Sequence, residues 1–322
     1  MSRASAAGDP PAGRPVVPAS PIRRLAVVGV GLIGGSCALA LKEAGAVVDV
    51  VGVGRGRANL DQALARGIVD RAFTFDEDWS GAVADADVVL VAAPVAQFPS
   101  IFAVLARHIG PRTIVTDAGS TKEDVVAAAR AAFDASSFAR FVPAHPIAGT
   151  EHSGAAAAFA ALFRGRTTVV APLPETDPAA LSTVAAMWEG CGARIVRLDP
   201  ATHDRTFAAV SHLPHVLAFA LVAELAARPD AERLFAHAAS GFRDFTRIAA
   251  SSPEMWRDIA LANRGALVEA IDDYSRMLSD MREAIATGDG GRLERLFARA
   301  SDARRRWAET SPAARPGVPL AE

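Results

Sequence analysis

The sequence has little of what would mark a secreted, metal-binding, nucleic-acid-binding or membrane protein. Its two cysteines, Cys37 and Cys191, stand far apart in helical-looking apolar stretches, so we expect buried reduced thiols, as in a cytoplasmic protein. No cluster of ligating residues has metal-site spacing, and we expect no metal. The net charge is only −2 without a Lys/Arg block, which argues against nucleic acid. No continuous apolar run of about 18 residues suggests a membrane span.

The chain is long enough for two domains. Its 322 residues exceed a typical single core, and 51% hydrophobic with 22% charged residues is ordinary for a soluble globular protein. Strand-like and helical runs alternate over residues 22–199, which predicts an α/β Rossmann-type, doubly wound parallel sheet. Residues 200–309 show only helical patterns and should form an all-helical domain, whose long helices could pack between two copies of the chain as a dimerisation domain. Residues 1–21 and 310–322 are Ala- and Pro-rich, and we expect a disordered leader and a mobile tail.

Short apolar runs predict the strands of one sheet. They cover residues 25–28, 47–53, 86–93, 113–116, 140–144, 167–171 and 194–198. Ligands of such sheets bind beyond the carboxyl ends of the strands. The residues at those ends are Gly29, Gly54, Pro94 and Asp117. The second half should contain long helices over residues 201–227, 253–287 and 291–308.

The stretch from Arg24 to Gly45 organises the first domain. Gly29, Gly31 and Gly34 follow the first strand in the spacing G-x-G-x-x-G, and a helical pattern starts at Ile33, directly after Leu32. The first glycine permits the tight turn, the second lets a pyrophosphate approach, and the third allows close helix packing. The helix N-terminus offers free N–H groups to phosphate. The alternative is a tight turn with only a structural role, but the placement between strand and helix favours cofactor binding.

The second strand departs from the usual NAD pattern. Such strands end in Asp or Glu, which binds the ribose hydroxyls and repels a 2′-phosphate. Here Gly54 occupies that position, Asp49 lies inside the strand, and Arg55 and Arg57 follow. Either arginine could pair with a phosphate, although both could equally be solvated loop residues. We therefore predict that NADP is preferred and that NAD is accepted.

Several polar groups interrupt apolar surroundings. His145 lies just beyond a strand in PAHPIAGTEHSG, with Thr150 and Glu151 nearby, and Ser120 follows the strand end at Asp117. In the helical half, SHLPH includes His215, and GFRDFTR places Asp244 and Arg247 three residues apart. Each motif alone could be structural, because a lone His is often not catalytic, the turn after Asp117 could only cap a helix, and an i, i+3 pair could be a solvated salt bridge.

Together these motifs resemble the prephenate and arogenate dehydrogenases of tyrosine biosynthesis. The matching stretches are VVGVGLIGGS, VTDAGSTK, HPIAGTEHSG, VSHLPH, GFRDFTRIA and PEMWRDI, in family order over about residues 23 to 290. The resemblance implies a Rossmann domain joined to a helical dimerisation domain, hence a homodimer. Some family members carry a fused mutase or regulatory domain, and we expect none here.

The resemblance also implies the chemistry, the oxidative decarboxylation of prephenate. His145 accepts the proton of the ring hydroxyl while hydride passes to the nicotinamide, and Ser120 holds the hydroxyl or His145 in line. Arg247 neutralises a substrate carboxylate, Asp244 orients the local helices, and His215, Thr150 and Glu151 line the pocket.

Other readings remain open at this point. Within the family, the combination of Glu151 and His215 favours prephenate as the substrate. An acidic group could equally bind the ammonium of arogenate. A 3-hydroxyacid-type dehydrogenase generally uses a lysine of its helical domain, and residues 200–322 contain none. A nucleotide sensor without turnover would not need His145, Ser120 and Arg247 together.

Overall fold

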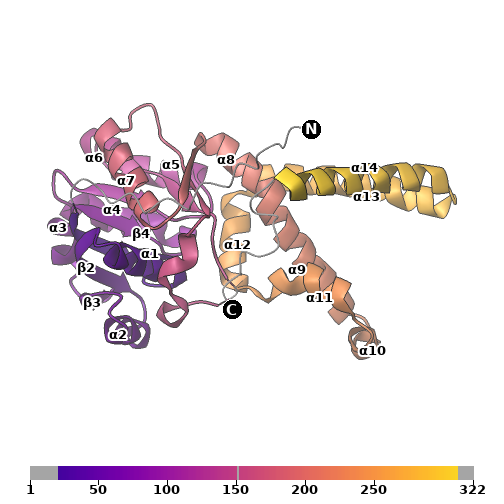
Figure 1. Ribbon diagram of the computed structural model, residues 1–322, viewed down its shortest axis with the longest axis horizontal. Helices are drawn as coiled ribbons and strands as arrows, with labels where there is room; N and C mark the ends of the chain where they lie inside the picture. Colours follow the sequence, from indigo (N-terminus) through magenta and orange to yellow (C-terminus); the bar gives the residue numbers. More distant parts are fainter. Residues whose placement is uncertain (1–20, 151, 311–322) are drawn as a thin grey trace, which may run out of the picture.

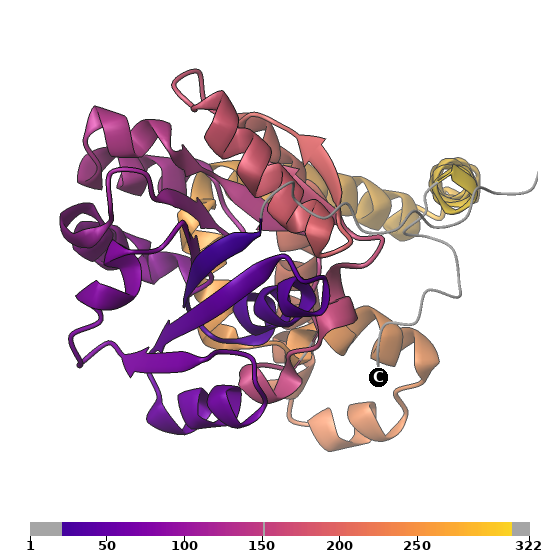
Figure 2. The ribbon, with the colours of Figure 1, turned by 60° about the vertical axis from the view of Figure 1, so that its left-hand side comes forward.

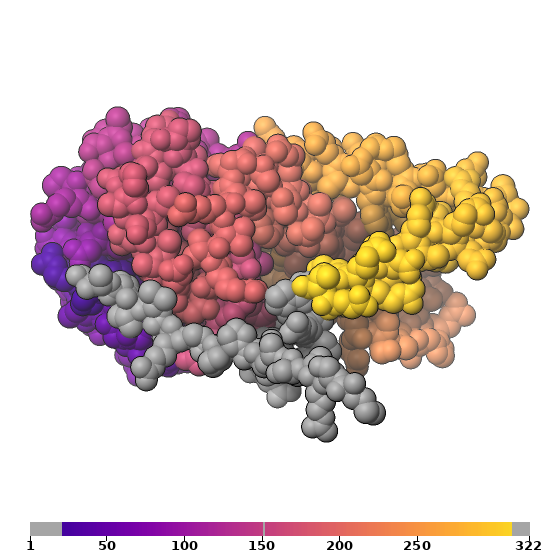
Figure 3. Space-filling model, turned by 45° about the horizontal axis from the view of Figure 1, so that its top comes forward, coloured from indigo at the N-terminus to yellow at the C-terminus, as the bar shows by residue number. Residues whose placement is uncertain are grey.

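The computed structural model describes residues 21–150 and 152–310. The expected leader up to residue 20, the tail from residue 311 and Glu151 therefore lie outside the described residues. An α/β unit occupies one side of the molecule and a set of helices the other, with the paired helices α13 and α14 projecting away (Figure 1). The space-filling view shows the same division (Figure 3). The fold is therefore a Rossmann-type α/β unit followed by helices, as predicted.

The centre of the α/β unit is a six-stranded sheet in the order β3-β2-β1-β4-β5-β6, parallel in every pairing. Its strands are β1 (Ile22–Val28), β2 (Val47–Gly54), β3 (Arg71–Thr74), β4 (Val88–Val91), β5 (Ile114–Asp117) and β6 (Phe141–Val142). The order reverses between β1 and β4, which opens a ligand crevice at their carboxyl ends.

Helices cover both faces of this sheet (Figure 2). They are α1 (Leu32–Glu43), α2 (Arg57–Ala65), α3 (Ser80–Ala84), α4 (Phe98–His108), α5 (Glu123–Ala132), α6 (Ala135–Ala139) and α7 (Pro178–Gly190). Two separate apolar clusters result. One packs β1 against α1 and α7 around Leu25, Leu41 and Trp188, and the other packs α4 and α5 on the opposite face around Phe102 and Phe141. Strands buried on both faces explain the continuous apolar runs in the sequence.

The expectation of a single sheet is wrong. The predicted strand 140–144 divides at Pro143, and a second sheet follows in the order β7-β8-β9, formed by β7 (Ala144–Pro146), β8 (Thr167–Val170) and β9 (Arg194–Arg197). Strand β7 is antiparallel to β8. Because proline has no N–H for a strand ladder, the chain leaves the first sheet at Pro143. This turn carries His145 out of the main sheet.

The helical part contains α8 (Pro200–Phe207), α9 (Leu213–Ala226), α10 (Ala231–Ala236), α11 (Ser240–Thr246), α12 (Pro253–Ala262), α13 (Arg264–Ala286) and α14 (Gly290–Thr310). Two of the predicted long helices are broken. A π-helical turn, Ala208–His212, separates α8 from α9 just before Pro214, as expected where proline removes a backbone donor. Asn263 separates α12 from α13, and its side chain donates to the carbonyl of Asp204.

One stretch of the helical part has the length and apolar composition of a membrane span, which by itself is weak evidence for one. Pro200–Ala226 is long and apolar enough by length and composition, and it is the one such stretch in the described part of the chain. The polar residues of SHLPH interrupt this apolar stretch. Many of its apolar side chains are not buried, including Val210 and Leu221. The amphipathic helices α13 and α14 likewise expose Ile285 and Phe297.

Candidate active site

The glycine turn between β1 and α1 has the shape that a dinucleotide requires. Gly29 has a φ of +104°, and a Cβ there would lie 2.5 Å from the backbone of Ala92. A Cβ on Gly34 would lie 2.3 Å from the carbonyl oxygen of Gly29. In contrast, a Cβ on Gly31 would meet nothing within 4 Å. Two glycines are therefore required by packing, while the space at Gly31 is open for a ligand.

Helix α1 presents its N-terminus to this open space. It begins at Leu32, followed by Ile33, and no side chain caps it. Its first N–H groups are therefore available to an anion. The residues present thus fit a nicotinamide dinucleotide, with the pyrophosphate beside Gly31.

The end of β2 carries no acid, as predicted, since the strand ends at Gly54. Both following arginines are exposed and each lies near carboxylates. Arg55 is 3.8 Å from Glu254 of α12. Arg57 is 2.9 Å from Asp61 and 3.8 Å from Glu77. A 2′-phosphate would have to compete with these exposed pairs, which are individually weak.

A buried ion pair lies at the end of β5. The carboxylate of Asp117 pairs with the ammonium of Lys122, and both side chains are fully buried. Asp117 also accepts from the N–H groups of Gly119 and Ala144, at 2.8 and 3.1 Å, and Lys122 donates to the carbonyl of Ala144 at 2.8 Å. Asp117 was predicted to bind cofactor, but its oxygens join β5 to β7. These contacts fix Ala144, the residue before His145. Pro94, which follows β4, is partly exposed.

His145 lies in β7 and is buried, with 9% of its surface exposed. Its Nδ1 lies 2.8 Å from Nε2 of His203 on α8. Nδ1 of His203 lies 2.7 Å from Oδ1 of Asp204. The ring of Phe207 packs against both imidazoles at centroid distances of 5.0 and 4.5 Å. The candidate base is therefore held by a row of side chains from the helical part.

Burial lowers the pKa of His145 well below its usual value, and His203, Lys122 and His212 lower it further. The imidazole is consequently neutral at physiological pH, which general-base chemistry requires. Burial also lowers the pKa of His212, to about 4. The charge of Asp204 and a hydrogen bond with the backbone of Ser120 raise the pKa of His212, whereas His203 and His215 lower it. The half-buried Ser120 is thereby close to the histidines of the helical part.

His215 faces the same region from α9. Its Nδ1 donates to the carbonyl of Ser211 at 2.9 Å, which leaves Nε2 as an acceptor. The ring stacks on Trp256 with centroids 3.5 Å apart. Burial lowers the pKa of His215, and the charge of Arg247 lowers it further. The exposed guanidinium of Arg247 is therefore near His215.

The remaining predicted residues lie outside the row of side chains that holds His145. Helix α11 ends at Thr246, so Arg247 begins a 3-10 turn rather than continuing the helix of Asp244. Asp244 is exposed and accepts from Arg243 at 3.1 Å. Thr150 is half-buried in the loop after β7, and its hydroxyl accepts from the N–H of His152 at 3.2 Å.

The loop that carries Thr150 is fastened to the glycine turn. Asn59 of α2 donates to the carbonyl of Val30 at 2.7 Å and accepts from the N–H of Ala155 at 2.8 Å. Arg66 donates to three carbonyl oxygens within residues 155–158. The cofactor turn and the candidate substrate loop are thus one connected structure.

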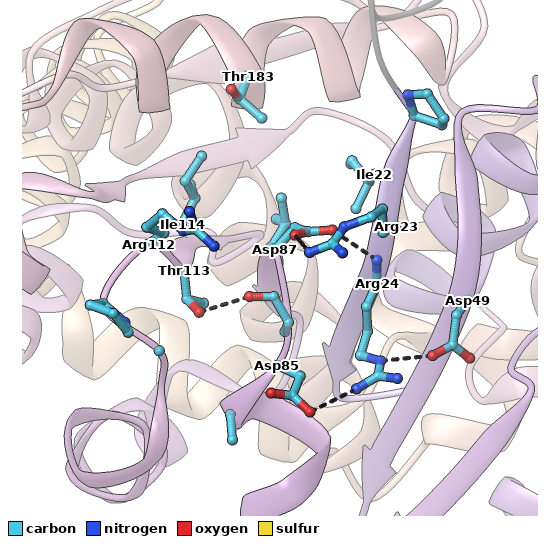
Figure 4. A pocket seen from close by; sticks show the side chains of 16 residues that line it. Ile22, Arg23, Arg24, Asp49, Asp85, Asp87, Arg112, Thr113, Ile114 and Thr183 are labelled. Carbon is cyan, nitrogen blue, oxygen red and sulfur yellow. Dashed lines mark hydrogen bonds and ion pairs between the residues drawn. The ribbon is translucent and has the colours of Figure 1, made fainter.

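A cavity of about 1060 Å³ lies at the other end of the sheet (Figure 4). Most of its charged groups pair with one another, since Arg24 donates to Asp49 at 2.8 Å and Arg23 to Asp87 at 3.3 Å. Ligands of doubly wound sheets bind at the carboxyl ends of the strands. This cavity is at the amino ends and is not the active site.

Sequence reasoning missed three buried polar residues of the site, His203, Asp204 and Lys122. A weak signal existed, because the polar pair His203-Asp204 lies within the first helix after the predicted domain boundary. Nothing local indicated that this pair would contact His145, since the contact joins residues 58 positions apart.

Comparisons with known proteins agree with this geometry. Residues 37–197 match the family model of the prephenate dehydrogenase nucleotide-binding domain, and residues 199–299 match that of the prephenate dehydrogenase dimerization domain. The chain is 34% identical to a cyclohexadienyl dehydrogenase of Zymomonas mobilis, covering 88% of this chain and 95% of the relative. It is 36% identical to a prephenate dehydrogenase of Bacillus subtilis, covering 86% and 74%.

A solved structure is similar as well. The prephenate dehydrogenase of Aquifex aeolicus, in complex with hydroxyphenyl propionate and NAD+, superposes with a TM-score of 0.83 at 33% identity, over 89% of this chain and 99% of that one. With both domains matched in order, the chain belongs to the prephenate dehydrogenase family of nicotinamide-dependent oxidoreductases.

Proposed function

We propose that this protein is a prephenate dehydrogenase that converts prephenate to 4-hydroxyphenylpyruvate and carbon dioxide in tyrosine biosynthesis. The observation that carries the proposal is His145, a buried imidazole kept neutral in β7, just beyond the carboxyl end of β6. It faces the helical part that carries His215 and Arg247. A base there is well placed between a cofactor on the glycine turn and a substrate on the helices.

The residues of this chain divide the work of the reaction. His145 takes the proton of the ring hydroxyl, and Ser120 hydrogen-bonds that hydroxyl or His145 and keeps the two in line. The bound nicotinamide supplies the hydride acceptor. Loss of the ring carboxylate as carbon dioxide then leaves its electron pair in the ring, which becomes aromatic, and His145 returns the proton to the ring oxygen to give the phenol of 4-hydroxyphenylpyruvate.

The helical side would bind the substrate. The guanidinium of Arg247 is permanently charged and can hold a carboxylate through two hydrogen bonds. His215, Thr150 and Glu151 would line the pocket, and Asp244 would orient the local helices. We favour prephenate over arogenate, with a dual-substrate enzyme as the alternative, because His215 offers an uncharged ring to a ketone side chain. Its lowered pKa keeps that ring neutral.

We further propose that NADP is preferred and that NAD is accepted. Support comes from the missing acid at Gly54 and from the exposed positions of Arg55 and Arg57. One charged contact to the 2′-phosphate would contribute about 1.5 to 3 kcal/mol, or roughly ten- to hundredfold in affinity. Arg55→Ala should therefore lower kcat/KM for NADP by about tenfold and leave that for NAD near wild type. If NAD is preferred by the wild type, or the ratio does not change, this proposal fails.

A homodimer in the cytoplasm completes the proposal. The exposed apolar side chains of α9, α13 and α14 would be covered by a second copy of the chain. Cys37 and Cys191, with sulfurs 3.8 Å apart and unbonded, fit a reducing compartment. Light scattering at micromolar concentration should give twice the mass of one chain, and a monomer would refute the interface.

The experiment that tests the function mixes the purified protein with prephenate and either cofactor. We expect reduced nicotinamide to form together with one equivalent of carbon dioxide. Arogenate is assayed in parallel, and a tenfold or greater preference for arogenate in kcat/KM would reassign the substrate. No turnover with either compound, despite cofactor binding, would favour a nucleotide sensor.

A further inference from the structure

A row of three buried side chains extends away from the candidate base. Asp204, His203 and His145 are connected by contacts of 2.7 and 2.8 Å, and none of them is more than 9% exposed. The first two come from α8 and the third from β7, so the row crosses from the helical part to the α/β unit. Neither His203 nor Asp204 has a role in the chemistry described above.

The anchor of the row is the carboxylate of Asp204. Its Oδ1 accepts from the N–H of Lys122 at 2.8 Å, and its Oδ2 accepts from the N–H of Glu123 at 2.9 Å. These N–H groups lie at the N-terminus of α5, a ten-residue helix. Both oxygens therefore act as acceptors in a position that favours negative charge. Asn263 also fixes the backbone of Asp204 by donating to its carbonyl at 2.8 Å.

Counting protons along the row gives one arrangement. An ionised carboxylate can only accept, so Nδ1 of His203 must carry the hydrogen. A neutral imidazole has one N–H, so Nε2 of His203 is then an acceptor. Nδ1 of His145 must consequently donate to it. The single hydrogen of neutral His145 is used in this bond, and its Nε2 is left with a free lone pair.

We propose that Asp204, acting through His203, selects the reactive nitrogen of His145, making Nε2 the atom that accepts the substrate proton. Asp204 and His203 are positioning residues, because neither touches the substrate. The identity of the substrate in this inference rests on the proposed function. The tautomer of His145 does not, because it follows from the contacts of the row alone. The opposite tautomer would point an N–H at the substrate hydroxyl and could not act as a base.

The row also favours the product of the proton transfer. When Nε2 of His145 takes the proton, the imidazolium keeps its Nδ1–H bond to His203, so no hydrogen bond has to be exchanged. The positive charge then lies at one end of a row that has a carboxylate at the other. Because α8 supplies both positioning residues, the base is complete only when the helical part is docked on the α/β unit.

Three substitutions test the inference by kinetics. Asp204→Asn replaces an acceptor with an amide that can donate to Nδ1 of His203, which inverts both imidazoles. We expect kcat to fall by about 10² or more with KM for prephenate within about threefold. In His203→Ala, kcat should fall by a similar factor. His203→Gln should retain kcat within about tenfold of wild type, because its amide can still accept from His145.

Asp199→Asn provides the matched control. Asp199 caps the N-terminus of the same helix through the N–H of Thr202 at 2.9 Å and does not contact the row. It should change thermal stability more than kcat. If Asp204→Asn fails to fold, the contrast between His203→Ala and His203→Gln decides, and equal kcat values in those two variants would overturn the inference.

Nitrogen NMR of protein labelled with ¹⁵N-histidine gives a readout without substrate. At neutral pH the His145 signals, identified by their loss in His145→Asn, should show a protonated Nδ1 and a bare Nε2. In Asp204→Asn the protonation states of these two nitrogens should be reversed, with a bare Nδ1 and a protonated Nε2. A protonated Nε2 in the wild type would refute the inference even if prephenate is oxidised, whereas a bare Nε2 in an enzyme inactive on prephenate would leave it standing and reject only the substrate.

Discussion

Replacing Gly31 should separate cofactor binding from folding. Gly31 has φ and ψ of −108° and −156°, which alanine adopts without strain, and an added Cβ would meet no atom within 4 Å. Gly31→Ala should therefore change the free energy of unfolding by no more than about 0.5 kcal/mol. A bound pyrophosphate would have to approach the same space closely. We expect the Kd for NADP and for NAD to rise by at least about tenfold, a loss of about 1.4 kcal/mol.

Gly34→Ala is the matched control with the opposite result. Its Cβ would lie 2.3 Å from the carbonyl oxygen of Gly29 and 2.7 Å from a methyl group of Val27, so the backbone itself must move. Overpacking of this kind costs about 1–3 kcal/mol, which should lower Tm by roughly 2–12 °C for a domain of this size. Calorimetric melting and titration calorimetry measure the two effects. Normal cofactor affinity in a stable Gly31→Ala protein would refute the placement of the pyrophosphate at the glycine turn.

The other predictions concern the substrate and the base. Arg247→Ala should raise KM for prephenate by roughly ten- to hundredfold because a carboxylate loses a charged partner worth about 1.5 to 3 kcal/mol, and an unchanged KM would place that carboxylate elsewhere. The pH profile of kcat/KM should be flat from pH 8 to about 6.5 and fall only below that, because the lowered pKa of His145 delays its protonation. An acid limb centred above pH 7 would contradict the neutral buried base.

The parts of this structure that follow from local sequence were predictable. The glycine turn depends on three spaced residues and a neighbouring strand and helix, and it forms where the spacing predicts. The strands of the main sheet could be recognised because burial on both faces makes them continuous apolar runs. The edge strand β3 was missed because its residues are only partly buried or exposed.

The parts that depend on contacts distant in sequence were not predictable. The break at Pro143 could be inferred from the local sequence. The pairing of the following residues with residues 167–170 in a second sheet could not. His145 could be proposed as a base from its motif, whereas its partner His203 is supplied by a different domain. Asp117 illustrates the converse, since a polar residue at a strand end suggested a ligand site and its partner is the buried Lys122.

The most direct test of the account compares wild type and His145→Asn in the oxidation of prephenate, followed by absorbance of the reduced nicotinamide and by release of carbon dioxide. Asparagine keeps a polar side chain of similar reach at Nδ1 but cannot accept the proton. The account predicts wild-type turnover and a fall in kcat of roughly 10² to 10⁴ in the variant, with the Kd for cofactor near wild type. Undiminished turnover in a folded His145→Asn protein would contradict it.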